Sequence, residues 1–402
     1  MPRRSTNVVS IRQYPSTEQD INPKPIFDIQ TNATKPQRLE SLDALRGFDM
    51  LFIMGGAAVI TAIAGFFPDS AAWQTVAEQM THASWDGLRH HDTIFPLFLF
   101  IAGCSFPFSL EKQRQRGMSH SAIVLKAIKR GFMLMALGWV CNGILKLQFA
   151  ELRFWSVLAR IGMAWMCAAL IYMHVHSIKR ILLIVVGLLV GYSIISSLVV
   201  APDAPGAAAL TREGNIACYI DRTLFGAHCY RPDYDPEGLF STIPAIGTAL
   251  LGMLAGRWIK TEKEGLTGTR KALGMLAAGV ALGILGYLWS FWTPINKALW
   301  SSSFVCAVAC YSLIMLALFY YIIDVKRWRG WDFFFVVIGM NSIAIYMLPR
   351  FVNFDFMRDR LLGGVISLLP EHLYPVVEPT TYIITWWIFL YIMYRYKIFL
   401  KV

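Results

Sequence analysis

The stretch "THASWDGLRHHDTIFPLFLFIAG", residues 81–103, places three histidines and two aspartates directly before an apolar run. Every side chain from Ile94 to Ala102 is apolar. Such runs are typical of membrane spans, because a helix needs about 20 mostly apolar residues to cross a bilayer. Titratable groups are costly inside lipid. The stretch therefore predicts a polar cluster at the mouth of a membrane-spanning helix.

The composition of the whole chain indicates the same class of protein. Of the 402 residues, 56% are hydrophobic and 16% are charged, and the mean hydropathy is +0.48. A soluble chain carries roughly 25% charged residues. We therefore predict an all-α, polytopic membrane protein of about ten transmembrane helices. The ten predicted spans lie near residues 47–67, 93–110, 131–147, 154–175, 181–200, 239–258, 272–292, 301–323, 331–349 and 381–395.

The positions of the basic residues predict the orientation of these spans. Most of the 37 lysines and arginines fall in the even-numbered connections and the two tails, as expected for cytoplasmic segments. The net charge of +11 is explained by this bias, so we expect no nucleic-acid partner. Both termini are then cytoplasmic, residues 1–37 form a polar tail, and residues 38–402 form the membrane domain. Exoplasmic loops are predicted near residues 68–91, 201–238 and 350–380.

Two of the seven cysteines share one predicted exoplasmic loop. Cys218 and Cys229 could form a disulfide there, because disulfides persist outside the cytoplasm. Two free thiols are the alternative, and the spacing does not decide between them. The other five cysteines lie in predicted spans, where cysteine usually packs as a small apolar side chain.

Several polar residues near the predicted spans admit two interpretations. Asp92 can cap the second span, since its side chain can accept backbone N–H bonds at a helix start. Arg46 is three residues after Asp43, so it either forms a surface ion pair or faces an anionic ligand. Arg160 lies at membrane depth, where an ionisable side chain suggests a function. Asn341 could hydrogen-bond to a neighbouring helix.

The histidines and carboxylates of residues 81–92 could also suggest a metal centre, because both are common ligands. Their spacing matches no known ligand pattern, and we expect no metal.

Eight short motifs resemble the heparan-α-glucosaminide N-acetyltransferase family, in the family's order, from Arg38 to Val402. The motifs are "RLESLDALRGFDM", "HASWDGL…DTIFPLFLFIAG", "VLARIG", "YIDRTLFG", "DPEGLFSTIPAIGTALLGMLAGRW", "NKALWSSSF", "GMNSIAIYM" and "KIFLKV". The resemblance implies a transmembrane acyltransferase domain over residues 38–402. It implies transfer of acetyl from cytosolic acetyl-CoA to the amine of a glucosamine unit on the far side of the membrane. It also implies a homodimer, and the short chain with a cytoplasmic tail resembles bacterial inner-membrane homologues.

The resemblance also implies roles for individual residues. The family's proposed catalytic histidine corresponds to His82, and the aspartate that follows it corresponds to Asp92. The residues expected to hold acetyl-CoA are Arg46, Arg160, Asn341, Lys397 and Lys401. The residues expected to contact the amino sugar are Trp85, Asp86, Asp235 and Glu237. Asp86 stands where the family has asparagine, which leaves the acceptor sugar open.

Histidine suits this reaction, because an amine attacks a thioester only when it is unprotonated and imidazole is a base near neutral pH. His82 could instead become acetylated as a covalent intermediate. The alternative function is a membrane transporter for an amino sugar or N-acetylglucosamine. Transporters typically contain internal repeats and broken helices, and no clear repeat relates the two halves of this chain.

Overall fold

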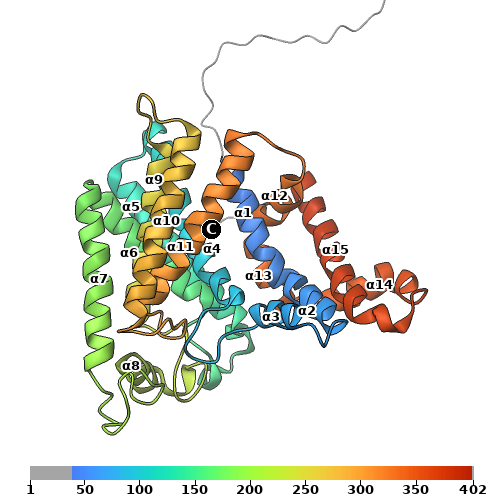
Figure 1. Cartoon of the computed structure of the whole chain (residues 1–402), viewed down its shortest axis with the longest axis horizontal. Coiled ribbons are helices and arrows are strands. Elements are labelled where there is room, and N and C mark those ends of the chain that lie inside the picture. Colours follow the sequence, from blue (N-terminus) through green and yellow to red (C-terminus); the bar gives the residue numbers. More distant parts are fainter. Residues whose placement is uncertain (1–38, 401–402) are drawn as a thin grey trace, which may run out of the picture. The chain divides into compact units, whose positions relative to one another are not determined.

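The structure, a computed structural model, describes residues 39–400, and helices joined by loops build this part of the chain (Figure 1). These residues contain no strand, so the predicted all-α class is confirmed. The predicted tail, 1–37, and Lys401 lie outside the described residues. The helices are α1 (Glu40–Leu51), α2 (Ala57–Gly65), α3 (Ala71–Gln79), α4 (His90–Gln115), α5 (His120–Cys141), α6 (Val157–His174), α7 (Ile178–Leu198), α8 (Ile216–Phe225), α9 (Thr242–Lys260), α10 (Gly268–Ser290), α11 (Ser302–Phe319), α12 (Asp332–Met340), α13 (Ser342–Met347), α14 (Phe354–Ile366) and α15 (Tyr374–Arg395).

Eight helical segments among the described residues are long and apolar enough to cross a membrane. They are Glu40–Gly65, His90–Gln115, Val157–His174, Ile178–Leu198, Thr242–Lys260, Gly268–Ser290, Ser302–Val325 and Glu371–Arg395. The pair α12 and α13 makes a ninth if it is one span, and it bends by 67° at Asn341.

The sequence predicts about ten spans, and length and composition identify eight or nine among residues 39–400. The predicted span at 131–147 falls on α5, whose first half carries Lys126, Lys129 and Arg130. These charges keep α5 out of the set of apolar helices, although its 22 residues are long enough to cross a bilayer.

The outward faces of α7 and α10 carry apolar side chains. Leu183 on α7 is 71% exposed, and Leu273 and Ile284 on α10 are each 58% exposed. Apolar surface of this kind is expected where a helix faces lipid instead of water. These two helices therefore give the bundle a lipid-facing surface.

The most buried helix, α4, packs against α9 through glycines. A Cβ atom on Gly252 would lie 2.1 Å from the carbonyl oxygen of Phe100, and one on Gly256 would lie 2.1 Å from that of Cys104. Small residues let membrane helices approach this closely. The "LLGMLAG" segment is therefore a packing face inside a continuous helix.

The long predicted loops contain helices that the sequence interpretation missed. Residues 350–380 form α14 and the first turns of α15, which begins at Tyr374 and continues through Pro379. Residues 201–238 contain α8. Helices α3 and α8 lie toward one end of the bundle, which we call the α8 end, and the loop between α9 and α10 lies at the other (Figure 1).

Candidate active site

The loop after α3 brings His82 to the first turn of α4. Asp92 is the third residue of α4, and its Oδ2 accepts hydrogen bonds from the backbone N–H of Ala83 at 3.1 Å and of Arg89 at 3.2 Å. It therefore caps α4 from within the first turn, because Arg89 occupies the position before the helix. The same carboxylate holds the His82 loop against the helix.

The other Asp92 oxygen, Oδ1, contacts the side chains of His82 and Lys297. His82 Nδ1 lies 2.7 Å from Oδ1, and the Lys297 ammonium lies 3.3 Å from it. Lys297 Nζ is also 3.1 Å from His82 Nδ1. The structure thus brings the two predicted catalytic residues together and adds a lysine that the sequence analysis did not single out.

The contact with Asp92 determines which nitrogen of His82 can act as a base. A carboxylate only accepts hydrogen bonds, so the short 2.7 Å contact favours a proton on Nδ1. The Lys297 ammonium only donates, so it then pairs with Asp92 Oδ1 and not with Nδ1. The lone pair then lies on Nε2. The His82 side chain is 57% exposed, so a substrate can reach that nitrogen.

Lys297 lies in the loop between α10 and α11. Burial lowers the pKa of Lys297, and the nearby carboxylates of Asp92 and Glu237 oppose that shift. Two carboxylates beside one ammonium favour its charged form. Lys297 therefore supplies a positive charge next to His82.

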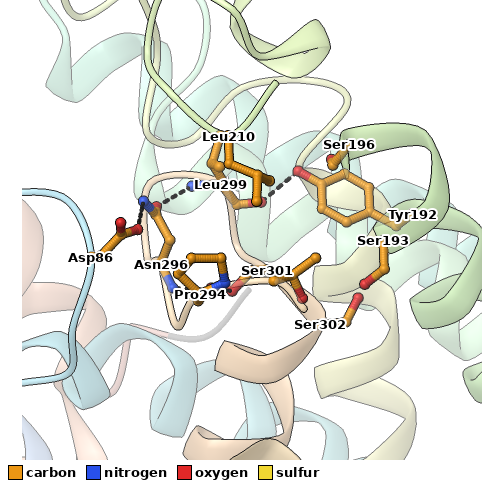
Figure 2. A pocket seen from close by; sticks show the side chains of 11 residues that line it. Asp86, Tyr192, Ser193, Ser196, Leu210, Pro294, Asn296, Leu299, Ser301 and Ser302 are labelled. Carbon is orange, nitrogen blue, oxygen red and sulfur yellow. Dashed lines mark hydrogen bonds between the residues drawn. The ribbon is translucent and has the colours of Figure 1, made fainter. Parts of the chain in front are cut away.

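Hydrogen bonds fix the shape of the Lys297 loop. Figure 2 shows Asn296 between Asp86 and the backbone of Leu299. Asn296 Nδ2 donates to Asp86 Oδ1 at 3.1 Å, and its Oδ1 accepts from Leu299 N at 2.9 Å. The Tyr192 hydroxyl donates to the Leu299 carbonyl at 2.6 Å. Asp86, predicted to contact the sugar, is thus in contact with the loop that carries Lys297.

A cavity of about 200 Å³ leads from His82 and Lys297 into the bundle. Its inner wall comes from α1, α4, α6 and α13 and is mostly apolar. The lining side chains of these four helices are Asp49, Met50, His91, Ile94, Phe95, Phe98, Val157, Leu158, Ile161, Ser342, Ile343 and Tyr346, and Ile53 of the segment that follows α1 joins them. Glu237 lines the same cavity. Of the four residues predicted to contact the sugar, Glu237 is thus the one that faces it.

Arg153 organises the carboxylates beside the cavity. It binds Asp235 through two hydrogen bonds, of 3.0 and 2.5 Å, and it also pairs with Glu237. Asp235 in turn accepts from the backbone N–H of Tyr230 and of Glu237, each at 2.9 Å. Asp235 thus shapes the loop, and Glu237 is presented to the cavity.

Arg160 lies fully buried behind this loop. It donates to the carbonyl of Gly238 at 3.2 Å and to the Ser241 hydroxyl, and its guanidinium lies 4.9 Å from the Trp300 ring centroid. Arg160 is close enough to Glu237 to interact with it electrostatically. It does not contact Arg46, the other arginine that was predicted to hold acetyl-CoA. The position favours a role in supporting the loop at residues 235–241.

Of the two alternatives for Cys218 and Cys229, the structure has two free thiols. Cys218 is buried in an apolar cluster with Tyr234 and Leu299, against which Trp85 packs. The Cys229 thiol donates to the Asp221 carbonyl at 3.3 Å. Each sulfur is therefore held by different neighbours.

Trp85 also donates to the Leu210 carbonyl at 3.0 Å, so it connects the His82 loop to the segment before α8.

The remaining residues predicted to hold acetyl-CoA lie apart from His82. Arg46 forms the predicted ion pair with Asp43 at 3.2 Å and donates to Ser105 at 3.3 Å. Asn341 uses both ends of its amide on the C-terminal segment, donating to the Ile398 carbonyl and accepting from Leu400 N, each at 3.1 Å. Lys397 is exposed just after α15.

No three His, Cys, Asp or Glu side chains lie close enough to share a metal ion within residues 39–400.

Comparisons with known proteins show which family this chain is similar to. The catalytic-domain model of heparan-alpha-glucosaminide N-acetyltransferase matches residues 38–283, which include His82, Asp92 and Glu237. The chain is 29% identical to the heparan-alpha-glucosaminide N-acetyltransferase of Homo sapiens over 91% of its own length. It is 27% identical to that of Mus musculus over 94% of its length. It spans 60% and 62%, respectively, of the length of these two relatives. The chain belongs to the heparan-alpha-glucosaminide N-acetyltransferase family.

Proposed function

We propose that this protein is a transmembrane N-acetyltransferase. It moves acetyl from cytosolic acetyl-CoA to the amine of a glucosamine-type sugar on the exoplasmic side. The observation that carries the proposal is the meeting of His82, Asp92 and Lys297 at a cavity that continues between apolar helices. Membership of the family, whose members in human and mouse are named N-acetyltransferases, supports the reaction class.

The three residues have distinct roles in this reaction. His82 Nε2 removes a proton from the amine as it attacks the thioester carbonyl. Asp92 holds the proton on Nδ1 and stabilises the imidazolium that forms, as an aspartate does in other triads. Lys297 stabilises the negative charge that develops on the carbonyl oxygen. Glu237 lies on the cavity wall, where it can bind the incoming ammonium group.

The cavity suits the acyl end of the donor, since its wall is mostly apolar and a thioester carries no charge. The donor phosphates are multiply charged and stay outside the lipid. We place them at the cytoplasmic end, near Arg46, with Lys397 and Lys401 in the tail. The basic residues in and beside the α4–α5 and α9–α10 connections support a cytoplasmic position for both, and the α8 end then faces the exoplasm.

We propose the setting of the protein from its resemblance to the family. Residues 38–402 form the acyltransferase domain, and the protein is a multi-pass protein of a bacterial inner membrane, working as a homodimer. Acetyl-CoA is its donor substrate, and an amino sugar is its acceptor.

Purified protein in detergent tests this proposal through two measurements. Wild-type protein should be thermally stabilised by acetyl-CoA and should N-acetylate glucosamine. His82→Ala should keep the stabilisation but lose transfer by about 10²-fold or more, the range expected on loss of a general base. His372→Ala, which changes an exposed histidine far along the chain, is the matched control and should stay fully active.

Stabilisation by sugar but not by acetyl-CoA would contradict the proposal and favour the amino-sugar transporter. Full activity of a folded His82→Ala protein would move the chemistry to another residue.

A further inference from the structure

A second carboxyl group lies at the cavity, in the middle of the first span. Asp49 on α1 is 2% exposed and lines the cavity that His82 and Lys297 also line. Its Oδ2 is buried, and none of residues 39–400 donates a hydrogen bond to it. A buried polar atom without a partner is rare and calls for an explanation.

We propose that Asp49 is a second catalytic residue, which protonates the sulfur of the departing thiol. This inference rests on the proposed acetyltransferase function. It assigns the two ends of the reaction to two groups, with His82 serving the amine and Asp49 serving the thiol.

The chain is irregular immediately after Asp49. The π-helical segment Phe52–Gly56 follows α1, and Gly55 within it has φ of 125°. Only glycine adopts such a backbone readily, and π-bulges often lie at functional sites. Ile53 of this segment lines the cavity together with Asp49.

Helices packed against α1 bring other titratable side chains to the same cavity or within electrostatic range of Asp49. His91 on α4 and Tyr346 on α13 line the same cavity. Tyr311 on α11 lies within electrostatic range of Asp49 and is 3.0 Å from His90 Nε2. Besides Asp49, the cavity lining includes the charged side chains of Lys297 and Glu237, together with His82.

An unpaired carboxylate is costly at membrane depth, so we assign Asp49 the neutral, proton-carrying form. The leaving sulfur, in contrast, must gain a proton to become neutral. A thiolate is disfavoured in apolar surroundings, and the cavity wall is mostly apolar. A neutral carboxyl group on that wall therefore supplies what the leaving sulfur needs.

The step balances as follows. A bond forms between the amine nitrogen and the acetyl carbon, and the bond between that carbon and sulfur breaks. Its electron pair goes to sulfur, which takes the proton of Asp49 and leaves as a thiol. The ammonium form of the substrate loses two protons through His82. One goes to solvent, and the other returns to Asp49 along the cavity that His82, His91 and Asp49 all line.

The test compares two donors whose thiols differ in acidity. An alkyl thioester, S-acetyl-N-acetylcysteamine, needs a proton on its leaving sulfur. The S-acetyl ester of 4-nitrothiophenol does not, because its thiolate is stable. Asp49→Asn should lower kcat by about 10²-fold or more with the alkyl donor and with acetyl-CoA, and it should leave kcat with the aryl donor at the wild-type value.

Two control variants make the result specific. Asp324→Asn changes another carboxyl group with a buried, unpartnered Oδ2, in the π-helical segment Tyr320–Val325 and away from the cavity lining. It should be fully active with both donors. His82→Ala should be impaired with both donors, since the amine needs its base in either case.

Equal losses of Asp49→Asn with both donors, or no loss with the alkyl donor, would overturn the inference. If that variant does not fold, the wild-type protein decides. Because Asp49 supplies the proton, the wild-type kcat should be similar for donors with more acidic and less acidic thiols. A steep decline in kcat from the aryl to the alkyl donor would overturn the inference. Failure of the wild-type protein with every donor would instead overturn the proposed function.

Discussion

Replacing Asp92 by asparagine tests how the imidazole is held. In the wild-type protein Asp92 Oδ1 accepts from His82 Nδ1 at 2.7 Å, and Oδ2 accepts from two backbone N–H groups. The asparagine oxygen can take the place of Oδ2 and preserve both backbone bonds. Its NH₂ group then replaces Oδ1 and donates to Nδ1. The His82 proton must move to Nε2, which removes the base.

The size of the effect follows from the hydrogen bond. A bond to a charged group contributes roughly 1.5–3 kcal/mol. The variant loses the bond that stabilises the tautomer with its proton on Nδ1, and it gains a bond of similar strength that stabilises the tautomer with its proton on Nε2. The total is roughly 3–6 kcal/mol, which corresponds to a loss of about 10²- to 10⁴-fold in kcat.

The assay is steady-state N-acetylation of glucosamine from acetyl-CoA, with thermal unfolding recorded in parallel. Asp92→Asn should lower kcat while the melting temperature stays near the wild-type value. Asp69→Asn, an exposed change in the turn between α2 and α3, is the matched control and should be unaffected. Wild-type kcat in a folded Asp92→Asn protein would refute the tautomer argument.

Three further changes test other contacts. Lys297→Met should lower kcat by about 10²-fold, and a double-mutant cycle with Asp92→Asn should be non-additive because the side chains touch. Gly252→Leu should lower the yield of folded protein in size-exclusion chromatography, because its Cβ would meet a carbonyl of α4, whereas Gly187→Leu has open space. Burial raises the pKa of Asp221 to about 7. The contribution of this carboxyl group to the free energy of unfolding is therefore fully present below its ordinary pKa near 4, and it is lost as the pH rises to 7 and above. Asp221→Asn should remove that pH dependence, so that the variant gains roughly 4 kcal/mol in free energy of unfolding relative to the wild-type protein between low pH and pH 8. Melting temperatures of the two proteins that change in parallel with pH would contradict this prediction.

The polar cluster before α4 could be predicted because its residues are neighbours in the sequence. His82 and Asp92 are ten positions apart, and the apolar run after them marks the start of a span. Lys297 is 215 positions from His82. A single sequence contains no signal that connects them, and the motif "NKALWSSSF" was the only indication that the residue mattered.

The errors in the fold have local causes. Residues 350–380 lack an obvious long apolar run, yet α15 begins within them at Tyr374, and Pro375 lies in its first turn, where proline is tolerated. Cys218 and Cys229 share a loop, but α8 turns the first of them into an apolar cluster. Asp49 was not singled out, because its isolation from donors is visible only in three dimensions.

The most direct test of the central claim uses proteoliposomes of one protein orientation, with acetyl-CoA and glucosamine on opposite sides of the membrane. We predict N-acetylglucosamine on the glucosamine side only when acetyl-CoA is on the cytoplasmic side, and we predict no product from vesicles that contain His82→Ala. Product formed with both substrates on the cytoplasmic side alone, or glucosamine carried across without acetylation, would contradict the account.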